Sequence, residues 1–326
     1  MAVYTQVSDE ELAGFIAEHG LGELRSFKGI AEGVENTNYM VETAHPSGHA
    51  RRFILTIYEK RVKLEDLPFF LGLMEHLAAR GIDCPLPVRD RHGAQVVELS
   101  GRPAAIVTFL DGLSVRRPER QHCALAGEAL ARLHLAGLDY AVPRPNALGP
   151  DGWRPLYERF KDRAGEIQPG LDAVIEAELD WLLPRWPTDL PRGVIHADLF
   201  PDNVFFLGGR LSGIIDFYFA CNDWLAYDIA ICLNAWCFEP DFSFNVTKGQ
   251  ALLEGYESVR PLDAGERAAL PVLARGAAMR FLLTRAHDWL TTPTTALVAP
   301  HNPGDYLRRL RFHQRVASPR DYGLES

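Results

Sequence analysis

The N-terminal part of the chain alternates between helical and strand-like hydrophobic patterns. A capping box at 8–11 precedes Leu12, Phe15 and Ile16, which recur on one helical face and predict a short helix. Alternating apolar and polar residues predict strands at 24–30, 38–43, 52–58, 95–99 and 103–109. Between the third and fourth strands, residues 64–80 predict an amphipathic helix with a proline in its first turn. The pattern therefore predicts a small antiparallel sheet with one packed helix.

Helical patterns dominate the rest of the chain. We predict a boundary at Asp111-Gly112, between an N-terminal domain (1–110) and a larger, mainly helical C-terminal domain (111–326). Residues 227–238 are apolar almost all round and predict a buried helix, and residues 266–290 predict a long closing helix. Three segments are expected to be irregular: 143–155 (a loop or a substrate-side insertion), 291–303, and the last dozen residues, which should be frayed.

Composition and charge narrow the class of protein. The chain has 326 residues, of which 47% are hydrophobic and 24% charged, as in ordinary soluble domains. A net charge of −9 disfavours a nucleic acid as partner, since phosphate binding needs a basic surface. The five cysteines form no C-x-x-C motif, and no apolar run reaches the roughly 18 residues of a membrane span. We expect a cytoplasmic protein that acts on a small molecule and binds no membrane, and the sequence does not indicate its oligomeric state.

The strongest chemical signal lies in residues 194–216. A short apolar run ends in a His-x-Asp motif at Asp198, and Asn203 follows five residues later. A second apolar run, 211–215, ends at Asp216. Kinase chemistry needs a carboxylate that orients the substrate hydroxyl, and oxygen ligands for the Mg²⁺ on ATP. We predict that Asp198 is the catalytic base and that Asn203 and Asp216 bind Mg²⁺.

A structural interpretation competes with the catalytic one for each residue of this motif. Asp198 could simply cap a helix, and Asn203 and Asp216 could form local turns. The spacing of all three, at the exits of strand-like runs, favours phosphoryl transfer. His196 is expected to brace the loop by hydrogen bonding, and His134, at the end of an apolar helical stripe, to be buried and hydrogen-bonded. Gly208-Gly209 predicts a hairpin turn, and neither a P-loop nor a G-x-G-x-x-G unit is present.

These motifs resemble those of the aminoglycoside-phosphotransferase-like kinases. The similar stretches are His196-Ala197-Asp198-Leu199-Phe200-Pro201-Asp202-Asn203, Gly213-Ile214-Ile215-Asp216-Phe217 and Asn222-Asp223-Trp224-Leu225-Ala226-Tyr227-Asp228. Within this superfamily the chain most resembles the bacterial homoserine kinases, in the stretches 33–39, 53–59, 216–222 and 280–285. The resemblance implies an α+β, two-lobed, protein-kinase-like fold that uses ATP and Mg²⁺.

The resemblance also implies a nucleotide site. The turn between the first two predicted strands should cover the phosphates, through backbone amides around Gly33 and the side chains of Asn36, Thr37 and Asn38. The turn has one glycine where such kinases have several, so a plain polar hairpin is the competing interpretation. The adenine should lie against backbone groups of the link between lobes, at Thr108, Phe109 and Leu110.

One position departs from the kinase pattern. The third strand should carry a lysine that contacts the phosphates and pairs with a helix glutamate, and Thr56 stands there instead. Lys60, Arg61 or Lys63 could supply the missing charge, with Glu75 as the candidate helix partner. This departure motivates the alternative of a catalytically silent nucleotide-binding pseudokinase.

The acceptor site is expected to involve four side chains. Tyr218 follows the predicted metal ligand Asp216 and would shape the pocket. Asp223 or Asp228 could hold an ammonium group, and we favour Asp223 because the resemblance implies a structural Asp228 that braces the catalytic loop. Arg280 or Arg285 is the candidate partner of a substrate carboxylate, although Arg285 could equally pair with an acid one turn away. We predict a kinase for L-homoserine in threonine biosynthesis. The alternatives are another small hydroxyl substrate, such as an aminoglycoside, choline or methylthioribose.

Overall fold

The computed structural model describes residues 5–30, 36–44, 48–59, 63–293 and 299–324. It divides into two compact units, residues 1–111 and residues 112–326. Gly33, Lys60 and Arg61 lie outside the described residues. None of the helices in the described ranges has the length and apolar character that a membrane span requires.

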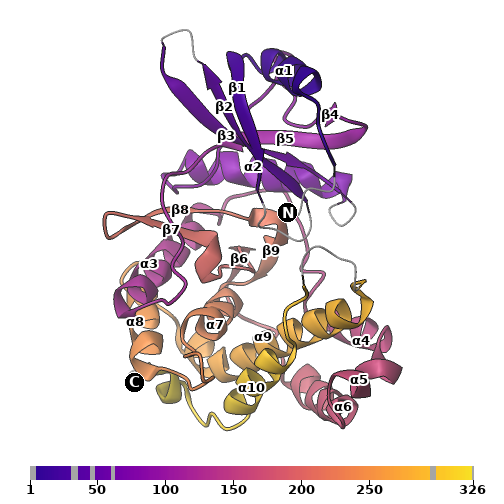
Figure 1. The fold of residues 1–326 in the computed structure, drawn as a ribbon. Helices are drawn as coiled ribbons and strands as arrows, with labels where there is room; N and C mark the ends of the chain where they lie inside the picture. Colours follow the sequence, from indigo (N-terminus) through magenta and orange to yellow (C-terminus); the bar gives the residue numbers. More distant parts are fainter. Residues whose placement is uncertain (1–4, 31–35, 45–47, 60–62, 294–298, 325–326) are drawn as a thin grey trace. The chain divides into compact units, whose positions relative to one another are not determined.

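The first unit is built on an antiparallel sheet in the order β1-β2-β3-β5-β4 (Figure 1). Its strands are β1 (Glu23–Gly29), β2 (Thr37–Ala44), β3 (Ala50–Ile57), β4 (Val97–Leu99) and β5 (Arg102–Thr108). In the β2–β3 pair Asn38 lies opposite Thr56, which brings the two predicted phosphate-site positions together. The predicted strands are confirmed, with ends shifted by at most two residues.

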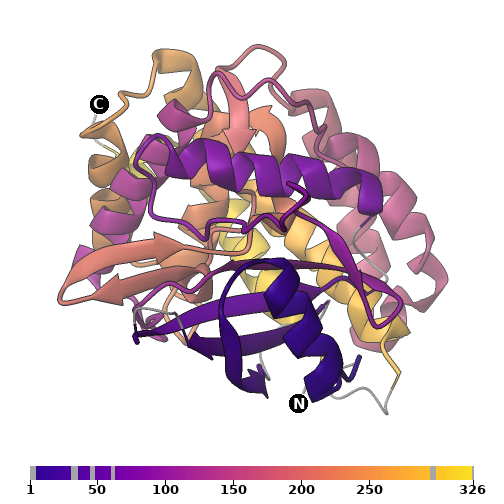
Figure 2. The same ribbon diagram turned by 90° about the horizontal axis from the view of Figure 1, so that it is seen from above.

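Helices α1 (Asp9–Glu18) and α2 (Leu67–Ala78) flank this sheet. The capping box between Ser8 and Glu11 starts α1, as predicted. Leu12, Phe15 and Ile16 of α1 pack with alternate sheet residues in one buried cluster. Its sheet residues are Tyr39, Val41, Phe53, Leu55, Ile57, Leu99, Ala104 and Ile106. Helix α2, with its proline in the first turn, lies on the other side of the sheet (Figures 1 and 2). Side chains alternate along a strand, so Thr56 points to the face opposite α1.

The second unit is mainly helical, with two small sheets that hold its central loops. Its helices are α3 (Arg120–Ala136), α4 (Pro150–Glu158), α5 (Ala164–Ile167), α6 (Leu171–Leu182), α7 (Leu225–Trp236), α8 (Val246–Glu257), α9 (Ala264–Thr291) and α10 (Gly304–His313). Strands β6 (Arg192–Ile195) and β9 (Cys221–Trp224) form one sheet, and β7 (Val204–Leu207) and β8 (Arg210–Ile214) form the other. The predicted Gly208-Gly209 turn joins β7 to β8, where both glycines have a positive φ, at 58° and 77°.

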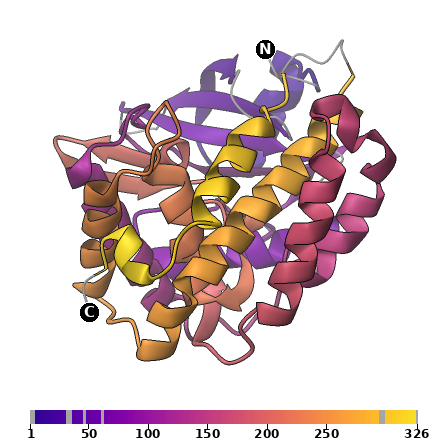
Figure 3. The same ribbon diagram turned by 90° about the horizontal axis from the view of Figure 1, so that it is seen from below.

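Helix α9 organises this unit. It packs against α7, against α10 and against α4, α5 and α6, as the view from below shows (Figure 3). The predicted buried helix, α7, and closing helix, α9, are both confirmed. Helices α3 and α8 pack closely because a Cβ atom at Gly127 would meet the backbone of Leu252, and one at Gly255 the backbone of Ala124. Glycine is required at both positions.

Two expectations about irregular segments are wrong. Segment 143–155 contains the start of α4, since Pro150 occupies the first turn of that helix, where its missing N–H costs nothing. The described part of the tail, up to Leu324, is packed and not frayed. Tyr322 is fully buried and lies 2.8 Å from the Nδ1 atom of His313, and Leu324 is also buried. A buried aromatic ring anchors the tail, and no local pattern revealed its partner.

Candidate active site

The loop after β6 carries Asp198, and the structure holds this loop from several sides. His196 is fully buried, and its Nε2 atom lies 2.9 Å from the carbonyl oxygen of Ile215. Its Nδ1 atom accepts from the N–H of Asp198, at 3.3 Å. Burial lowers the pKa of His196, so the ring is neutral and Nε2 carries the donated hydrogen. His196 therefore braces the loop, as predicted, and links it to the segment before Asp216.

Asp228 of α7 holds the same loop through its backbone. Its carboxylate accepts the backbone N–H groups of His196, at 2.7 Å, and of Ala197, at 2.9 Å. Ala197 has a left-handed φ of 63°, a conformation that costs a non-glycine residue about 1–3 kcal/mol and must be held by its surroundings. Its carbonyl oxygen accepts from the buried guanidinium of Arg280. Both ends of this alanine are thus held by buried, charged side chains.

Burial and hydrogen bonding have opposite effects on the pKa of Asp228. Burial by itself disfavours the carboxylate charge, but the hydrogen bond from His134 and the backbone N–H groups outweigh it and lower the pKa. His134 is fully buried, as predicted, with its Nε2 atom 3.1 Å from Asp228. Asp228 is therefore an ionised structural anchor of the loop.

Asn203 connects the three predicted catalytic positions. Its side-chain NH₂ group donates to the backbone oxygen of Asp198, at 2.8 Å, and approaches the Asp198 carboxylate, at 3.3 Å. Its backbone oxygen accepts from the N–H of Ile215, at 3.0 Å, which precedes Asp216. The motif is thus assembled at one place in the second unit. Asp216 is exposed and has a left-handed φ of 64°.

Asn203 and Asp216 offer oxygen donors of the kind that Mg²⁺ takes. Among the described residues, no group of three or more His, Cys, Asp or Glu side chains could hold a metal ion. Because the Asn203 NH₂ group faces Asp198, its carbonyl oxygen Oδ1 points away from that residue. Mg²⁺ uses one or two protein oxygens and completes its shell with water and phosphate. Asn203 and Asp216 fit this pattern.

The two arginines predicted for the substrate lie in different surroundings. Arg280 is 2% exposed, and its contact with Ala197 puts it under the catalytic loop. The Arg285 side chain is 17% exposed and stacks over Tyr306 of α10, with its guanidinium 4.6 Å from the ring centre. Asp305 lies 4.0 Å from Arg285, and the Asp198 charge also acts on it, although burial is the main influence and lowers its pKa.

Tyr218 and Asp223 follow the metal motif in the chain. Tyr218 lies in the 3₁₀ turn Phe217–Phe219 and is half-buried. Asp223, in β9, is buried and accepts from the side chain of Asn146, at 2.7 Å. Burial raises the pKa of Asp223 despite this hydrogen bond. Asn146 is a neighbour that the sequence did not reveal.

In the first unit the predicted phosphate-site residues form a hydrogen-bonded group. Thr56 donates to Asn38, at 2.8 Å, and Thr37 donates to Glu59, at 2.8 Å. The side chain of Asn36 accepts from the N–H of Glu59, at 3.3 Å. Glu59, which the sequence did not reveal, thus contacts Asn36 and Thr37, and its nearly buried carboxylate also pairs with Arg102, at 3.1 Å.

The charge that should replace the missing lysine is not identified by these contacts. Lys63 is exposed and 3.5 Å from Glu65. Glu75, the candidate helix partner, pairs with Arg89 at 2.8 Å, and Lys60 and Arg61 lie outside the described residues.

The predicted adenine-binding segment ends the first unit. Thr108 exchanges backbone and side-chain hydrogen bonds with Leu86, and the N–H of Phe109 donates to Arg52, at 3.3 Å. Leu110 is half-buried. The N–H groups of Thr108 and Phe109 therefore already have acceptors within the protein.

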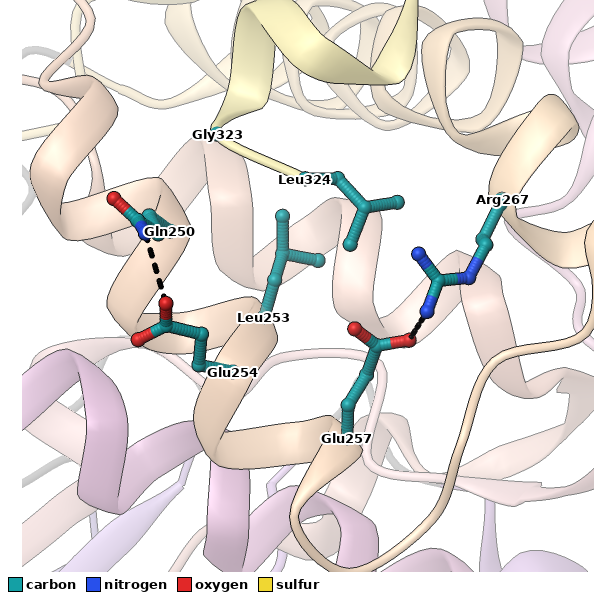
Figure 4. A pocket seen from close by; sticks show the side chains of 7 residues that line it. All are labelled: Gln250, Leu253, Glu254, Glu257, Arg267, Gly323 and Leu324. Atoms are coloured by element: carbon teal, nitrogen blue, oxygen red, sulfur yellow. Dashed lines mark hydrogen bonds and ion pairs between the residues drawn. The ribbon is translucent and has the colours of Figure 1, made fainter. Parts of the chain in front are cut away.

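A cavity of about 360 Å³ lies in the second unit, between α8, the start of α9 and the C-terminal tail (Figure 4). Its polar side chains satisfy one another. Gln250 donates to Glu254, at 2.8 Å, and Arg267 pairs with Glu257. None of the predicted site residues lines this cavity.

Comparison with known proteins identifies the relatives of the chain. Residues 26–262 match the model of the phosphotransferase enzyme family. The homoserine kinase of Bradyrhizobium diazoefficiens is 63% identical over 325 residues, which span 99% of this chain and 98% of the relative. That of Xanthobacter autotrophicus is 62% identical, and the match covers 99% of both chains.

Solved structures share the fold at low identity. An amicoumacin kinase in complex with AMP-PNP and Ca²⁺ superposes with a TM-score of 0.67 at 19% identity, covering 94% of this chain and 92% of the other. A spectinomycin phosphotransferase in complex with ADP gives a TM-score of 0.67 at 12% identity, covering 98% of both chains. The predicted α+β kinase-like fold class is confirmed.

Proposed function

The chain belongs to the homoserine kinases, within the phosphotransferase enzyme family, and on this premise we propose that it transfers the γ-phosphoryl group of ATP to the hydroxyl group of L-homoserine. The products are ADP and O-phospho-L-homoserine, on the route to threonine. The observation that carries the proposal is the hydrogen-bonded assembly of Asp198, Asn203 and the segment before Asp216.

In the proposed reaction Asp198 orients the substrate hydroxyl and accepts its proton. The hydroxyl oxygen attacks the γ-phosphorus, the bond from that phosphorus to the β-phosphate oxygen breaks, and ADP leaves with the electron pair. Asn203 orients the Asp198 carboxylate through its NH₂ group. Asn203 and Asp216 would hold Mg²⁺, which when bound neutralises phosphate charge. His196 and Asp228 keep the loop in place.

Arg285 is the better of the two candidates for the substrate carboxylate. Its partly exposed guanidinium can form a bidentate pair with a planar carboxylate, whereas the Arg280 side chain is buried and donates to Ala197. Tyr218 and Asp223 stay our predictions for the pocket wall and the ammonium group. We assign Arg280 to holding the catalytic loop, and its predicted contact with substrate remains a prediction.

For the nucleotide we retain the predicted residues of the first unit. These are Gly33, Asn36, Thr37, Asn38 and Thr56 for the phosphates and Thr108, Phe109 and Leu110 for the adenine. The hydrogen bonds of Asn36 and Thr37 with Glu59, and of Thr56 with Asn38, hold these side chains in place and support their assignment to the phosphates. We also propose a cytoplasmic location, supported by five cysteines that are all free and buried.

The test is ADP release from MgATP with L-homoserine, choline, methylthioribose and kanamycin as acceptors. We expect release with homoserine only, and a loss of about 10²–10⁴ in rate in Asp198→Asn, the usual contribution of one general base. Release with a different acceptor would refute the substrate. ATP binding without turnover on any acceptor would favour the pseudokinase that Thr56 suggested.

A further inference from the structure

We propose that His134 and Tyr256 are positioning residues for phosphoryl transfer, because a buried hydrogen-bond chain runs from Tyr256 through His134 and Asp228 to the loop that carries Asp198. The inference rests on the proposed function, since it concerns the orientation of the residue that accepts the hydroxyl proton. Tyr256 would thus affect catalysis although it lies on α8, 58 residues beyond Asp198 in the sequence (256 − 198).

Each step of the hydrogen-bond chain is within hydrogen-bond distance. The hydroxyl of Tyr256 lies 2.8 Å from the Nδ1 atom of His134, and the Nε2 atom of His134 lies 3.1 Å from Asp228. The Asp228 carboxylate then accepts the N–H groups of His196 and Ala197. Tyr256, His134 and Asp228 each have 0% exposed surface. Water is therefore excluded, and each member depends on its neighbours for hydrogen bonds.

The chain has a defined direction. Burial raises the pKa of Tyr256, so its hydroxyl stays protonated and donates to Nδ1 of His134. Because Nδ1 of His134 accepts the tyrosine hydroxyl, Nε2 carries the hydrogen and donates it to Asp228. On the other side, Arg260 donates to the Tyr256 oxygen, at 3.1 Å, and pairs with Glu266, at 2.9 Å. Tyr256 thus selects the tautomer of His134 that Asp228 requires.

Tyr256 can reach His134 because helices α3 and α8 pack closely. Gly127 of α3 and Gly255 of α8 stand where any Cβ atom would meet the backbone of the other helix. Gly255 directly precedes Tyr256, and His134 lies two turns beyond Gly127 on α3. The two glycines therefore bring the tyrosine hydroxyl to the histidine ring.

The Asp228 end of the hydrogen-bond chain stabilises the unfavourable backbone conformation of Ala197. Ala197 holds a left-handed φ of 63° directly before Asp198. If Asp228 loses its bond from His134, its buried charge is less compensated and its hold on the Ala197 N–H weakens. Asp198 would then sample orientations in which the substrate hydroxyl cannot transfer its proton.

The protein contains a second tyrosine–histidine pair that serves as a control. Tyr322 lies 2.8 Å from Nδ1 of His313, and Nε2 of His313 lies 3.0 Å from the Asn234 side chain. Both aromatic residues are buried. Asn234 in turn donates to the carbonyl oxygens of Ala230 and Ala274, within α7 and α9, so this chain does not lead to the catalytic loop.

The experiment compares Tyr256→Phe with Tyr322→Phe. Each change removes one hydroxyl from the same kind of bond. We expect Tyr256→Phe to lower kcat about threefold to tenfold, the worth of one hydrogen bond, with the KM values for ATP and homoserine unchanged. His134→Leu should lower kcat about 10- to 100-fold, as loss of an orienting residue does, and His134→Gln should recover part of it through its amide N–H. Tyr322→Phe should lower the unfolding temperature without changing kcat.

Amide hydrogen exchange gives a readout that needs no acceptor. We expect faster exchange at His196 and Ala197 in Tyr256→Phe, and wild-type exchange there in Tyr322→Phe. Equal kcat and equal loop exchange in the two variants would overturn the proposal. A wild-type protein that is silent with homoserine would instead refute the proposed function, and loop exchange would still decide whether the chain positions Asp198.

Discussion

Replacing Asp228 with asparagine tests how the catalytic loop is held. Two backbone N–H groups point at separate oxygens of the Asp228 carboxylate, at 2.7 and 2.9 Å, and His134 adds a third donor at 3.1 Å. Asparagine keeps one oxygen, and its NH₂ group faces a donor in place of the other. One buried donor then lacks an acceptor, which costs about 1–3 kcal/mol. With the lost charge, the free energy of unfolding should fall by about 3–5 kcal/mol, as for other broken buried pairs.

The pH dependence of this loss follows from the direction of the pKa shift. The folded-state pKa of Asp228 is lowered, so its charge stabilises the folded protein. This stabilisation is fully present above the unfolded-state pKa of about 4. That stability is lost as the pH falls from there toward the folded-state pKa. The difference between wild type and Asp228→Asn should be constant between about pH 7 and pH 5 and shrink below about pH 4.

The assay is urea unfolding followed by tryptophan fluorescence, together with kcat. Asp263→Asn is the matched control, because Asp263 caps α9 by accepting the N–H of Glu266, at 2.8 Å, and asparagine caps equally well. We expect kcat to fall about 10- to 100-fold in Asp228→Asn only, as for loss of an orienting side chain. If both variants unfold at the same urea concentration and turn over at the same rate, Asp228 does not anchor the loop.

Three further predictions concern the acceptor, the metal and helix packing. Arg285→Met should raise the KM for homoserine about 10- to 150-fold, the equivalent of a charged hydrogen bond, while exposed Arg308→Met should not; an unchanged KM would exclude Arg285 from the carboxylate site. Asn203→Ala should raise the Mg²⁺ concentration for half-maximal rate about 10- to 100-fold, and a wild-type Mg²⁺ requirement would remove it from the metal site. Gly255→Ala should lower the free energy of unfolding by about 1–3 kcal/mol through overpacking, whereas Gly14→Ala, in open space on α1, should raise it by roughly 0.5–1 kcal/mol. A stabilised Gly255→Ala protein would mean that α3 and α8 can separate without cost.

Local signals accounted for much of the architecture. The capping box at Ser8, the proline at the start of α2 and the Gly208-Gly209 turn each act within a few residues, so the chain itself reveals them. The His-x-Asp motif was also visible, because Asp198 and Asn203 are five residues apart and touch within one loop. The sequence alone therefore indicates the chemistry of this loop.

Partners distant in the chain could not be found in this way. The sequence predicted a structural Asp228 that braces the catalytic loop, but it did not reveal that His134 and Tyr256 form the hydrogen bonds behind that carboxylate. Arg280 and Arg285 are both arginines of α9. Arg280 is buried and donates to Ala197, whereas Arg285 stacks on Tyr306. Residue type and spacing determine which chemistry a chain can support, since they fix which groups are available. Burial and long-range contacts decide which group is ionised, oriented or free to meet a substrate, because these depend on segments that only folding brings together.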